Sequence, residues 1–137
     1  MKLESEQIQL INALDAISGV TARDCLVSKE TVTFMVPEKF MSKAIGKNGA
    51  NVKAAMQRFR KRVELFEHTE TPEKFIEKAF GLAKLEGIEI KVAGERKVAV
   101  VKADAQSKKI ILGNIGRLKK IKELCQRNYE VDEIRVR

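Results

Sequence analysis

Side chains with special chemistry are scarce in this chain of 137 residues, which has no tryptophan, one tyrosine, two cysteines and one histidine. The absence of tryptophan and the single tyrosine argue against a binding face built from stacked aromatic platforms. His68 is the single histidine, so no serine or cysteine nucleophile is matched with a convincing histidine base. No group of residues has the spacing of metal ligands. The Gly-Lys segment also lacks the GxxxxGK[ST] spacing of a nucleotide-binding loop. We therefore expect no enzyme, no cofactor, no metal and no small-molecule substrate, and we expect His68 to lie in an exposed linker.

Long apolar runs and paired cysteines are missing too. No window holds the roughly 18 consecutive apolar residues of a membrane helix, and the first residues lack the apolar core of a signal peptide. Cys25 and Cys125 lie a hundred residues apart inside apolar patterns, and there is no CxxC. Two buried thiols are therefore expected, with a disulfide or a metal ligand as the alternative. These features favour a cytoplasmic protein that does not contact membranes.

Acidic residues are missing from two long stretches of the chain. Its 27 lysines and arginines outnumber 19 aspartates and glutamates, for a net charge of +8. Residues 39–62 hold eight basic residues and residues 105–122 hold six, and neither stretch contains an acidic one. Such windows suit a polyanionic partner. The run Arg58, Arg60, Lys61 and Arg62 has two interpretations: it contacts nucleic acid, or it is the solvated end of a helix.

The same order of elements is expected twice: helix, strand, strand, helix, helix, strand. Helical spacing of apolar residues predicts the helices, and alternation predicts the strands. Gly19 is expected to end the first helix, and Pro37 is expected to end the second strand. The second strand, residues 31–36, is expected to be half-buried. In the first copy the elements are a helix around residues 10–17, strands at 25–27 and 31–36, helices at 38–44 and 52–59, and a strand at 63–66.

The second copy begins after His68-Thr69-Glu70. Thr71 is expected to cap a helix whose first residue is Pro72. Alternating strands follow, joined by a turn at Gly94-Glu95. The remaining expected elements are strands at 88–92 and 98–101, helices at 105–112 and 118–125, and a last strand containing Val131, Ile134 and Val136.

Each copy carries a Gly-x-x-Gly motif between its last two helices, at Gly46–Gly49 and at Gly113–Gly116. Glycine admits close approach of a ligand to the backbone and tolerates unusual dihedral angles. The free amides and the dipole at the N-terminus of the following helix favour an anion. A phosphate can therefore lie against such a loop. The alternative, a helix–helix corner that needs two glycines, is weakened because the motif recurs in equivalent places, each within an acid-free window.

The first motif with its surroundings, Ile45-Gly46-Lys47-Asn48-Gly49-Ala50-Asn51-Val52-Lys53, resembles the signature of KH domains, which clamp about four nucleotides. The order of elements resembles the type II form, and two copies in tandem resemble the KH pair of the NusA transcription factors, above all short archaeal NusA-like proteins. The resemblance implies an α+β, sandwich-like fold with two type II KH domains, residues 1–69 and 70–137. Each would be a three-stranded sheet packed on one side by three helices.

By this resemblance, single-stranded RNA would run along a groove beside each loop, with Ile45 and Val52 as the apolar floor in the first copy and Leu112 and Leu118 in the second. The same four residues would equally suit core packing. The second loop departs from the first because its middle residues are not basic and one residue is missing after it. The candidate RNA-binding residues are Lys43, Ile45, Gly46, Lys47, Asn48, Gly49, Asn51, Val52, Lys53, Leu112, Gly113, Asn114, Ile115, Gly116, Arg117, Leu118, Lys119 and Lys120.

The resemblance implies a role in transcription elongation, termination or antitermination. Two alternatives stay open. One is a ribosome-associated or RNA-processing protein, because type II KH domains occur in such proteins as well. The other is a protein-interaction adaptor that docks on RNA polymerase, a reading favoured by the altered second loop.

Overall fold

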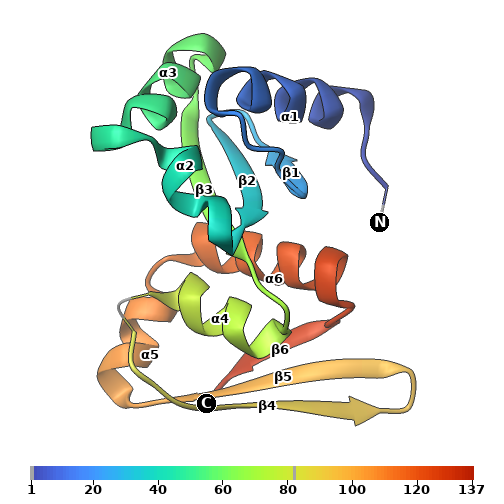
Figure 1. The fold of residues 1–137 in the computed structure, drawn as a ribbon. Helices are drawn as coiled ribbons and strands as arrows, with labels where there is room; N and C mark the ends of the chain where they lie inside the picture. The colour runs from blue at the N-terminus through green and yellow to red at the C-terminus, as the bar shows by residue number, and fades with distance from the viewer. Residues whose placement is uncertain (1, 82) are drawn as a thin grey trace. The chain divides into compact units, whose positions relative to one another are not determined.

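The computed structural model describes residues 2–81 and 83–137. The chain divides into two compact units, Met1–His68 and Thr69–Arg137. The described residues form a mixed α+β structure with two three-stranded sheets and six α-helices. Both units follow the order helix, strand, strand, helix, helix, strand (Figure 1), which confirms the doubled order of elements expected from the sequence.

The first unit has β2 at the centre of its sheet, antiparallel to β1 and parallel to β3. A parallel pair needs a crossover connection, and α2 and α3 supply it. The loop between these two helices therefore lies on the crossover. The elements are α1 (Ser5–Ser18), β1 (Asp24–Val27), β2 (Thr31–Pro37), the short 3-10 helix η1 (Glu38–Phe40), α2 (Met41–Ile45), a second 3-10 turn η2 (Lys47–Gly49), α3 (Ala50–Phe59) and β3 (Arg62–His68).

The second unit repeats this topology, with β5 antiparallel to β4 and parallel to β6. Gly94, at a φ of 64°, forms with Glu95 the tight turn between β4 and β5, as expected. The crossover from β5 to β6 runs through two helices. The elements are α4 (Pro72–Phe80), β4 (Leu85–Ala93), β5 (Arg96–Ala103), α5 (Ala105–Leu112), α6 (Ile115–Tyr129) and β6 (Glu133–Val136).

Capping residues explain where several helices begin and end. Gly19 ends α1 in the left-handed conformation, at a φ of 73°. The Thr71 hydroxyl accepts a hydrogen bond from an amide in the first turn of α4, whose first residue is Pro72. The Asp104 carboxylate caps α5 by accepting a hydrogen bond of 2.7 Å from the Ser107 amide, and this bond lowers the pKa of Asp104. The predicted starts at Pro72 and Ala105 and the stop at Gly19 are therefore confirmed.

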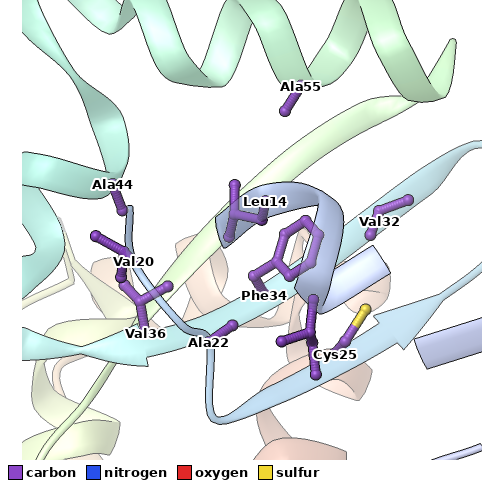
Figure 2. Close-up of a cluster of buried hydrophobic side chains, with 10 residues drawn as sticks. Leu14, Val20, Ala22, Cys25, Val32, Phe34, Val36, Ala44 and Ala55 are labelled. Carbon is purple, nitrogen blue, oxygen red and sulfur yellow. The ribbon is translucent and has the colours of Figure 1, made fainter. Parts of the chain in front are cut away.

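The core of the first unit lies between its helices and one face of its sheet (Figure 2). The even-numbered residues of β2 point to this face, and Phe34 at its centre lies 6.1 Å, centroid to centroid, from the ring of Phe59. Side chains from α1, α2 and α3 all reach the cluster, so the three helices cover the same side. Its buried members are Ile11, Leu14, Val20, Ala22, Cys25, Val32, Phe34, Val36, Ala44 and Ala55.

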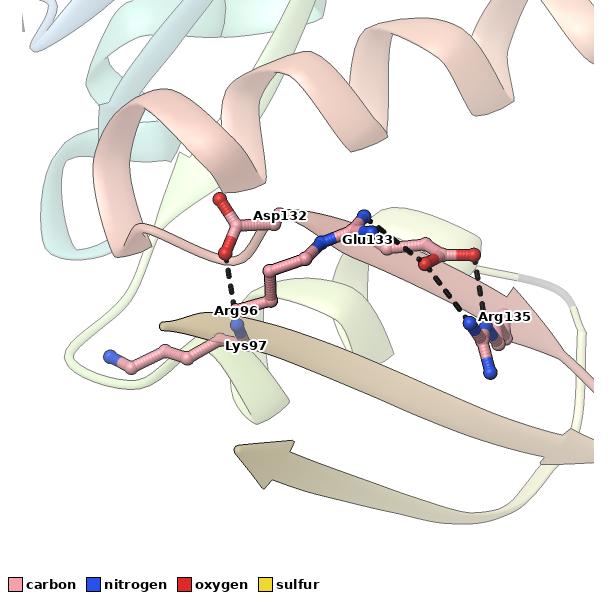
Figure 3. Close-up of polar contacts among 5 residues, drawn as sticks. All are labelled: Arg96, Lys97, Asp132, Glu133 and Arg135. Atoms are coloured by element: carbon pink, nitrogen blue, oxygen red, sulfur yellow. Dashed lines mark hydrogen bonds and ion pairs between the residues drawn. The ribbon is translucent and has the colours of Figure 1, made fainter. Parts of the chain in front are cut away.

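In the second unit, polar contacts join the entry to β6 to the start of β5 (Figure 3). The Lys97 amide donates to the Asp132 carboxylate at 2.9 Å, and the Asp132 amide donates to the Lys97 carbonyl at 2.9 Å. Glu133 pairs with Arg135 at 2.9 Å and with Arg96 at 3.4 Å, and the hydrogen bond from Arg135 lowers the pKa of Glu133. The ion pairs are exposed and contribute little; the backbone contacts set the strand register.

The expectation that β2 is half-buried is wrong. Thr31, Thr33 and Met35 are buried as well as the even-numbered residues, so both faces of this strand are shielded from solvent. Threonine alternates with apolar residues in this strand because threonine is a good strand former. Its small hydroxyl can be buried, so the alternation does not mean that one face is exposed. Alternation in the sequence therefore marked the strand correctly but not its burial.

Three smaller expectations also need correction. Val92, expected on an apolar strand face, is 69% exposed because β6 pairs with β5 only from Val98 onward, and Val92 lies opposite Lys97 beyond that point. Val131 is buried but precedes β6. His68 is the last residue of β3 and is half-buried, not exposed in a linker; partial burial lowers its pKa.

Both cysteines are buried thiols outside any disulfide, as expected, and burial raises the pKa of the Cys125 thiol to about 12. A thiol of that pKa is a poor nucleophile at neutral pH. Within residues 2–81 and 83–137, no group of three or more His, Cys, Asp or Glu side chains is placed to hold a metal ion. Over the same residues, no helix combines the length and apolar character needed to cross a membrane.

Candidate nucleic-acid interface

The first Gly-x-x-Gly loop has a backbone that depends on glycine. Gly46 follows α2 with φ 79° and ψ 166°, a region that is essentially restricted to glycine. A Cβ on Gly46 would lie 2.9 Å from the amide nitrogen of Asn51. Asn48 and Gly49 are left-handed, at φ values of 56° and 74°, and asparagine is one of the few other residues that tolerate this conformation. The loop therefore doubles back tightly into α3.

The N-terminus of α3 is open to a ligand. Its N-cap residue is Gly49, which has no side chain to bond the first amides of the helix. The Asn51 side chain turns back instead, and its amide donates to the Lys43 carbonyl at 2.9 Å, which ties α3 to α2. Asn51 thus has a positioning role in the loop that the sequence did not reveal. The Ala50 amide at the start of α3 already donates to the Lys47 carbonyl, so it is the helix dipole that favours an anion at this end.

The predicted residues of the first loop gather at one surface. Lys47 and Asn48 are exposed at the tip, and Lys53 is exposed on the first turns of α3. Ile45 and Val52, the predicted apolar floor, are half-buried, so they contribute to packing and still present part of their surface. Core packing and support of a bound base are therefore both possible for Ile45 and Val52, as the sequence indicates.

Lys43 has a neighbour that the sequence did not suggest. A Cβ placed on Gly19 would lie 3.3 Å from the Cε and Nζ atoms of Lys43, so the ammonium group lies against the C-terminal end of α1. A cation is favourable there because the helix dipole ends in unsatisfied carbonyls. Part of the positive charge at the loop is therefore held in place by the scaffold.

The basic run after α3 lies at the other end of that helix. A helix of ten residues is about 15 Å long, so Arg60 is about that far from Gly49 along the helix axis. Arg60, Lys61 and Arg62 line a depression together with Lys29, Glu30 and Met56, so one carboxylate stands among four basic residues. The Lys61 ammonium donates to the Ser28 carbonyl at 2.9 Å. The acid-free window at 39–62 is therefore divided into two basic regions. Contact of the second region with nucleic acid stays a prediction.

The second Gly-x-x-Gly loop has a different backbone. Gly113 has a φ of −72° and Gly116 is inside α6, which begins at Ile115. Neither glycine adopts the left-handed conformation. The Asn114 side chain caps α6 by accepting a hydrogen bond of 3.1 Å from the Arg117 amide. The helix thus starts inside the motif, where the first copy has the 3-10 turn η2.

The predicted residues of the second loop are spread over different environments. Leu118 is 8% exposed and belongs to the core, whereas Leu112 and Ile115 are 51% and 61% exposed. The Arg117 guanidinium donates to the Ala79 carbonyl at 3.0 Å. Of the two following lysines, Lys119 is exposed and Lys120 is half-buried. Leu112 and Leu118 therefore do not share a floor, and the second loop does not reproduce the first.

Comparison with known proteins identifies the family. The model of the KH domain family matches residues 10–92, more than half of the chain. A relative from Methanocaldococcus jannaschii named "Probable transcription termination protein NusA" is 31% identical over 137 residues, which cover 99% of this chain and 75% of the relative. The chain belongs to the archaeal NusA-like family of KH-domain proteins. A Halococcus morrhuae protein of the same name is 29% identical, with 96% of this chain and 95% of the relative covered.

The fold of this archaeal NusA-like chain agrees with a solved structure. The crystal structure of APE1850 matches with a TM-score of 0.88 at 25% identity, and the match covers 98% of this chain and 100% of that one. The KH family match contains the loop at 46–49 and ends before the loop at 113–116. The loop with the glycine-dependent backbone is therefore the one inside the matched region.

Alanine replacements at the two loops should have opposite effects on stability. We expect Gly46→Ala to destabilise the chain by about 1–3 kcal/mol, because its dihedral angles suit glycine and its Cβ would meet Asn51. We expect Gly116→Ala to stabilise it by about 0.5–1 kcal/mol, because this glycine is helical and open space surrounds its Cβ. Urea unfolding followed by circular dichroism measures both. Equal effects of the two replacements would contradict the different backbones of the loops.

Proposed function

We propose that this NusA-like protein binds single-stranded RNA and is not an enzyme, and that its two units act as tandem type II KH domains, residues 1–69 and 70–137. The role proposed for it is in transcription elongation, termination or antitermination. Family membership and the names of its relatives support a transcription-related role. The observation that carries RNA binding is the backbone of the Gly46–Gly49 loop.

The proposed contact is between the RNA backbone and this loop. A phosphate would lie against Gly49, which has open space where a side chain would stand, and at the positive end of the α3 dipole. Lys47, with Lys53 nearby, would supply positive charge, and Ile45 and Val52 would support the adjacent bases. The predicted contacts of the second loop, Leu112 to Lys120, stay predictions with weaker support, because the Asn114 side chain already caps α6.

A salt series tests whether binding is carried by phosphate contacts. We would measure the anisotropy of short fluorescent single-stranded RNAs of mixed, pyrimidine-rich and purine-rich sequence with the full chain. Three to four phosphate contacts predict that log Kd rises with log salt at a slope of about 2 to 3. A matched duplex RNA serves as the control and should bind more weakly. If no RNA shows salt-dependent binding, the proposed function fails.

A further inference from the structure

The second loop carries apolar side chains where the first carries polar ones. With the glycine pairs aligned, Ile110 stands at the position of Lys43, and Ile115 stands at the position of Asn48. Asn114 likewise replaces Lys47 in the middle of the motif. Each of these exchanges removes charge or polarity from a surface that suits a phosphate in the first unit. The two loops are therefore suited to different ligands.

The apolar residues of this region are exposed to an unusual extent. Ile110, Leu112 and Ile115 are 48%, 51% and 61% exposed, and they lie within six residues of chain. They make up half of the six large hydrophobic residues that are exposed in the described part of the chain. Ile110 and Leu112 are two residues apart in α5 and therefore point to different sides of this helix, so Ile110 has to be considered with its own surroundings.

One of these residues, Ile110, lines a cavity within the second unit. Its volume is about 290 Å³, and Phe80, Ile110, Ile111, Leu118 and Ile121 contribute to an apolar lining. A dry cavity of about 150 Å³ holds a benzene-sized group, so this one has room for a bulky apolar side chain. Its polar lining residues are Asn114, which caps α6, and Arg117, which bonds the Ala79 carbonyl.

The lining favours a protein side chain over an RNA base. A base has several polar atoms on its edge, and burying them without hydrogen bonds is costly. A leucine, methionine or phenylalanine side chain has no polar hydrogen-bonding edge and loses nothing in such a cavity. The amide of Arg117 at the N-terminus of α6 is already bonded to the Asn114 side chain, so it does not offer its hydrogen to a phosphate.

The charge around the cavity specifies the partner further. Residues 105–122 contain six basic residues and no acidic one, among them the exposed Lys109 and Lys119. Arg117 brings a positive charge to the cavity itself. A segment that pairs with this surface would therefore carry carboxylates on either side of its apolar anchor.

We propose that the second loop and its cavity form a docking site for an acidic amphipathic protein segment, which inserts a bulky apolar side chain between α4, α5 and α6 and surrounds it with carboxylates. The site is separate from the RNA loop of the first unit and goes beyond RNA binding. It gives the chain one surface for nucleic acid and another for protein.

The test uses designed peptides as probes of the full chain. The probes are fluorescein-labelled helical peptides with Glu and Asp around one of four anchors: leucine, phenylalanine, methionine or tryptophan. Anisotropy should show saturable binding of at least one, and a scrambled peptide of the same composition should bind at least about tenfold more weakly, a difference of about 1.4 kcal/mol. If no probe binds more tightly than its scrambled form, the proposal is overturned.

Variants locate the site and separate this proposal from RNA binding. The replacement Ile110→Ser affects a half-exposed residue that lines the cavity and should weaken peptide binding about tenfold or more. Val92→Ser, at an exposed valine elsewhere in the unit, is the matched control and should change nothing. Single-stranded RNA binding should be unchanged in both. Loss of RNA binding with unchanged peptide binding would show that the surface serves RNA, and unchanged binding of both ligands would exclude it as a site; either result overturns the proposal.

Discussion

The double replacement Lys47→Asp/Asn48→Asp should lower the affinity for single-stranded RNA by about 100-fold, or about 2.7 kcal/mol. Lys47 changes from +1 to −1 and Asn48 from 0 to −1, so the tip of the loop becomes negative where a phosphate would lie. Both side chains are exposed, and aspartate tolerates the left-handed conformation of residue 48 almost as well as asparagine. The fold should therefore survive while the phosphate is repelled. Anisotropy with fluorescent RNA measures the change.

The matched control is Asn114→Asp/Ile115→Asp at the second loop. Aspartate at residue 114 can still cap α6, and residue 115 is 61% exposed. We expect RNA affinity to fall much less in this variant, while binding of the acidic peptides should fall because like charges are brought together. Circular dichroism must first show that both variants are folded. Equal losses of RNA affinity at the two loops would contradict the distinction between them and would favour one extended RNA surface.

Phe34→Ala should destabilise the first unit by about 3–5 kcal/mol. The Phe34 side chain is fully buried at the centre of β2 and lies 6.1 Å from the ring of Phe59. Its removal leaves a cavity that α1, α2 and α3 cannot close, since all three helices already pack on the same cluster. Because such a loss is comparable with the whole stability of a small domain, the variant should be partly unfolded at room temperature.

Phe40→Ala is the control for this prediction. Phe40 is 42% exposed in η1 and its ring faces the Lys39 ammonium at 5.1 Å, so its removal should cost about 1 kcal/mol or less. Urea unfolding followed by circular dichroism, with amide exchange of the β2 residues, measures both variants. A similar loss of stability in the two would mean that Phe34 is not the centre of the core.

Much of the fold was predictable because it depends on local patterns. Thr71, Pro72 and Gly19 mark helix ends through hydrogen bonds and dihedral preferences within a few residues of chain. The order of elements follows from the spacing of apolar residues, and the repeat of that order pointed to the two glycine motifs. Lys43, Lys47, Asn48 and Lys53 around the first loop are exposed, and their contact with RNA stays a prediction.

Burial on both faces of β2 was not predictable, because the threonine–valine alternation of this strand is also what a half-exposed strand would have. The exposure of Val92 depends on where β6 stops pairing, which is a property of a distant segment. The bond from Asn51 to Lys43 and the position of Lys43 against α1 also required the folded chain. In each case the burial or contact of the residue depends on a segment that is distant in the sequence.

The sequence by itself determined the family, the repeated order of elements, the basic character of both loop regions and the position of each glycine pair. It did so because these are properties of composition and short-range spacing. Only the tertiary structure decided that Gly46 and Gly49 use the conformational freedom of glycine while Gly113 and Gly116 do not. The reason is that α6 starts inside its motif, capped by Asn114, whereas α3 starts after it. Two motifs that share the Gly-x-x-Gly pattern thus have different structures: the first is a loop before its helix, and the second is the capped start of a helix.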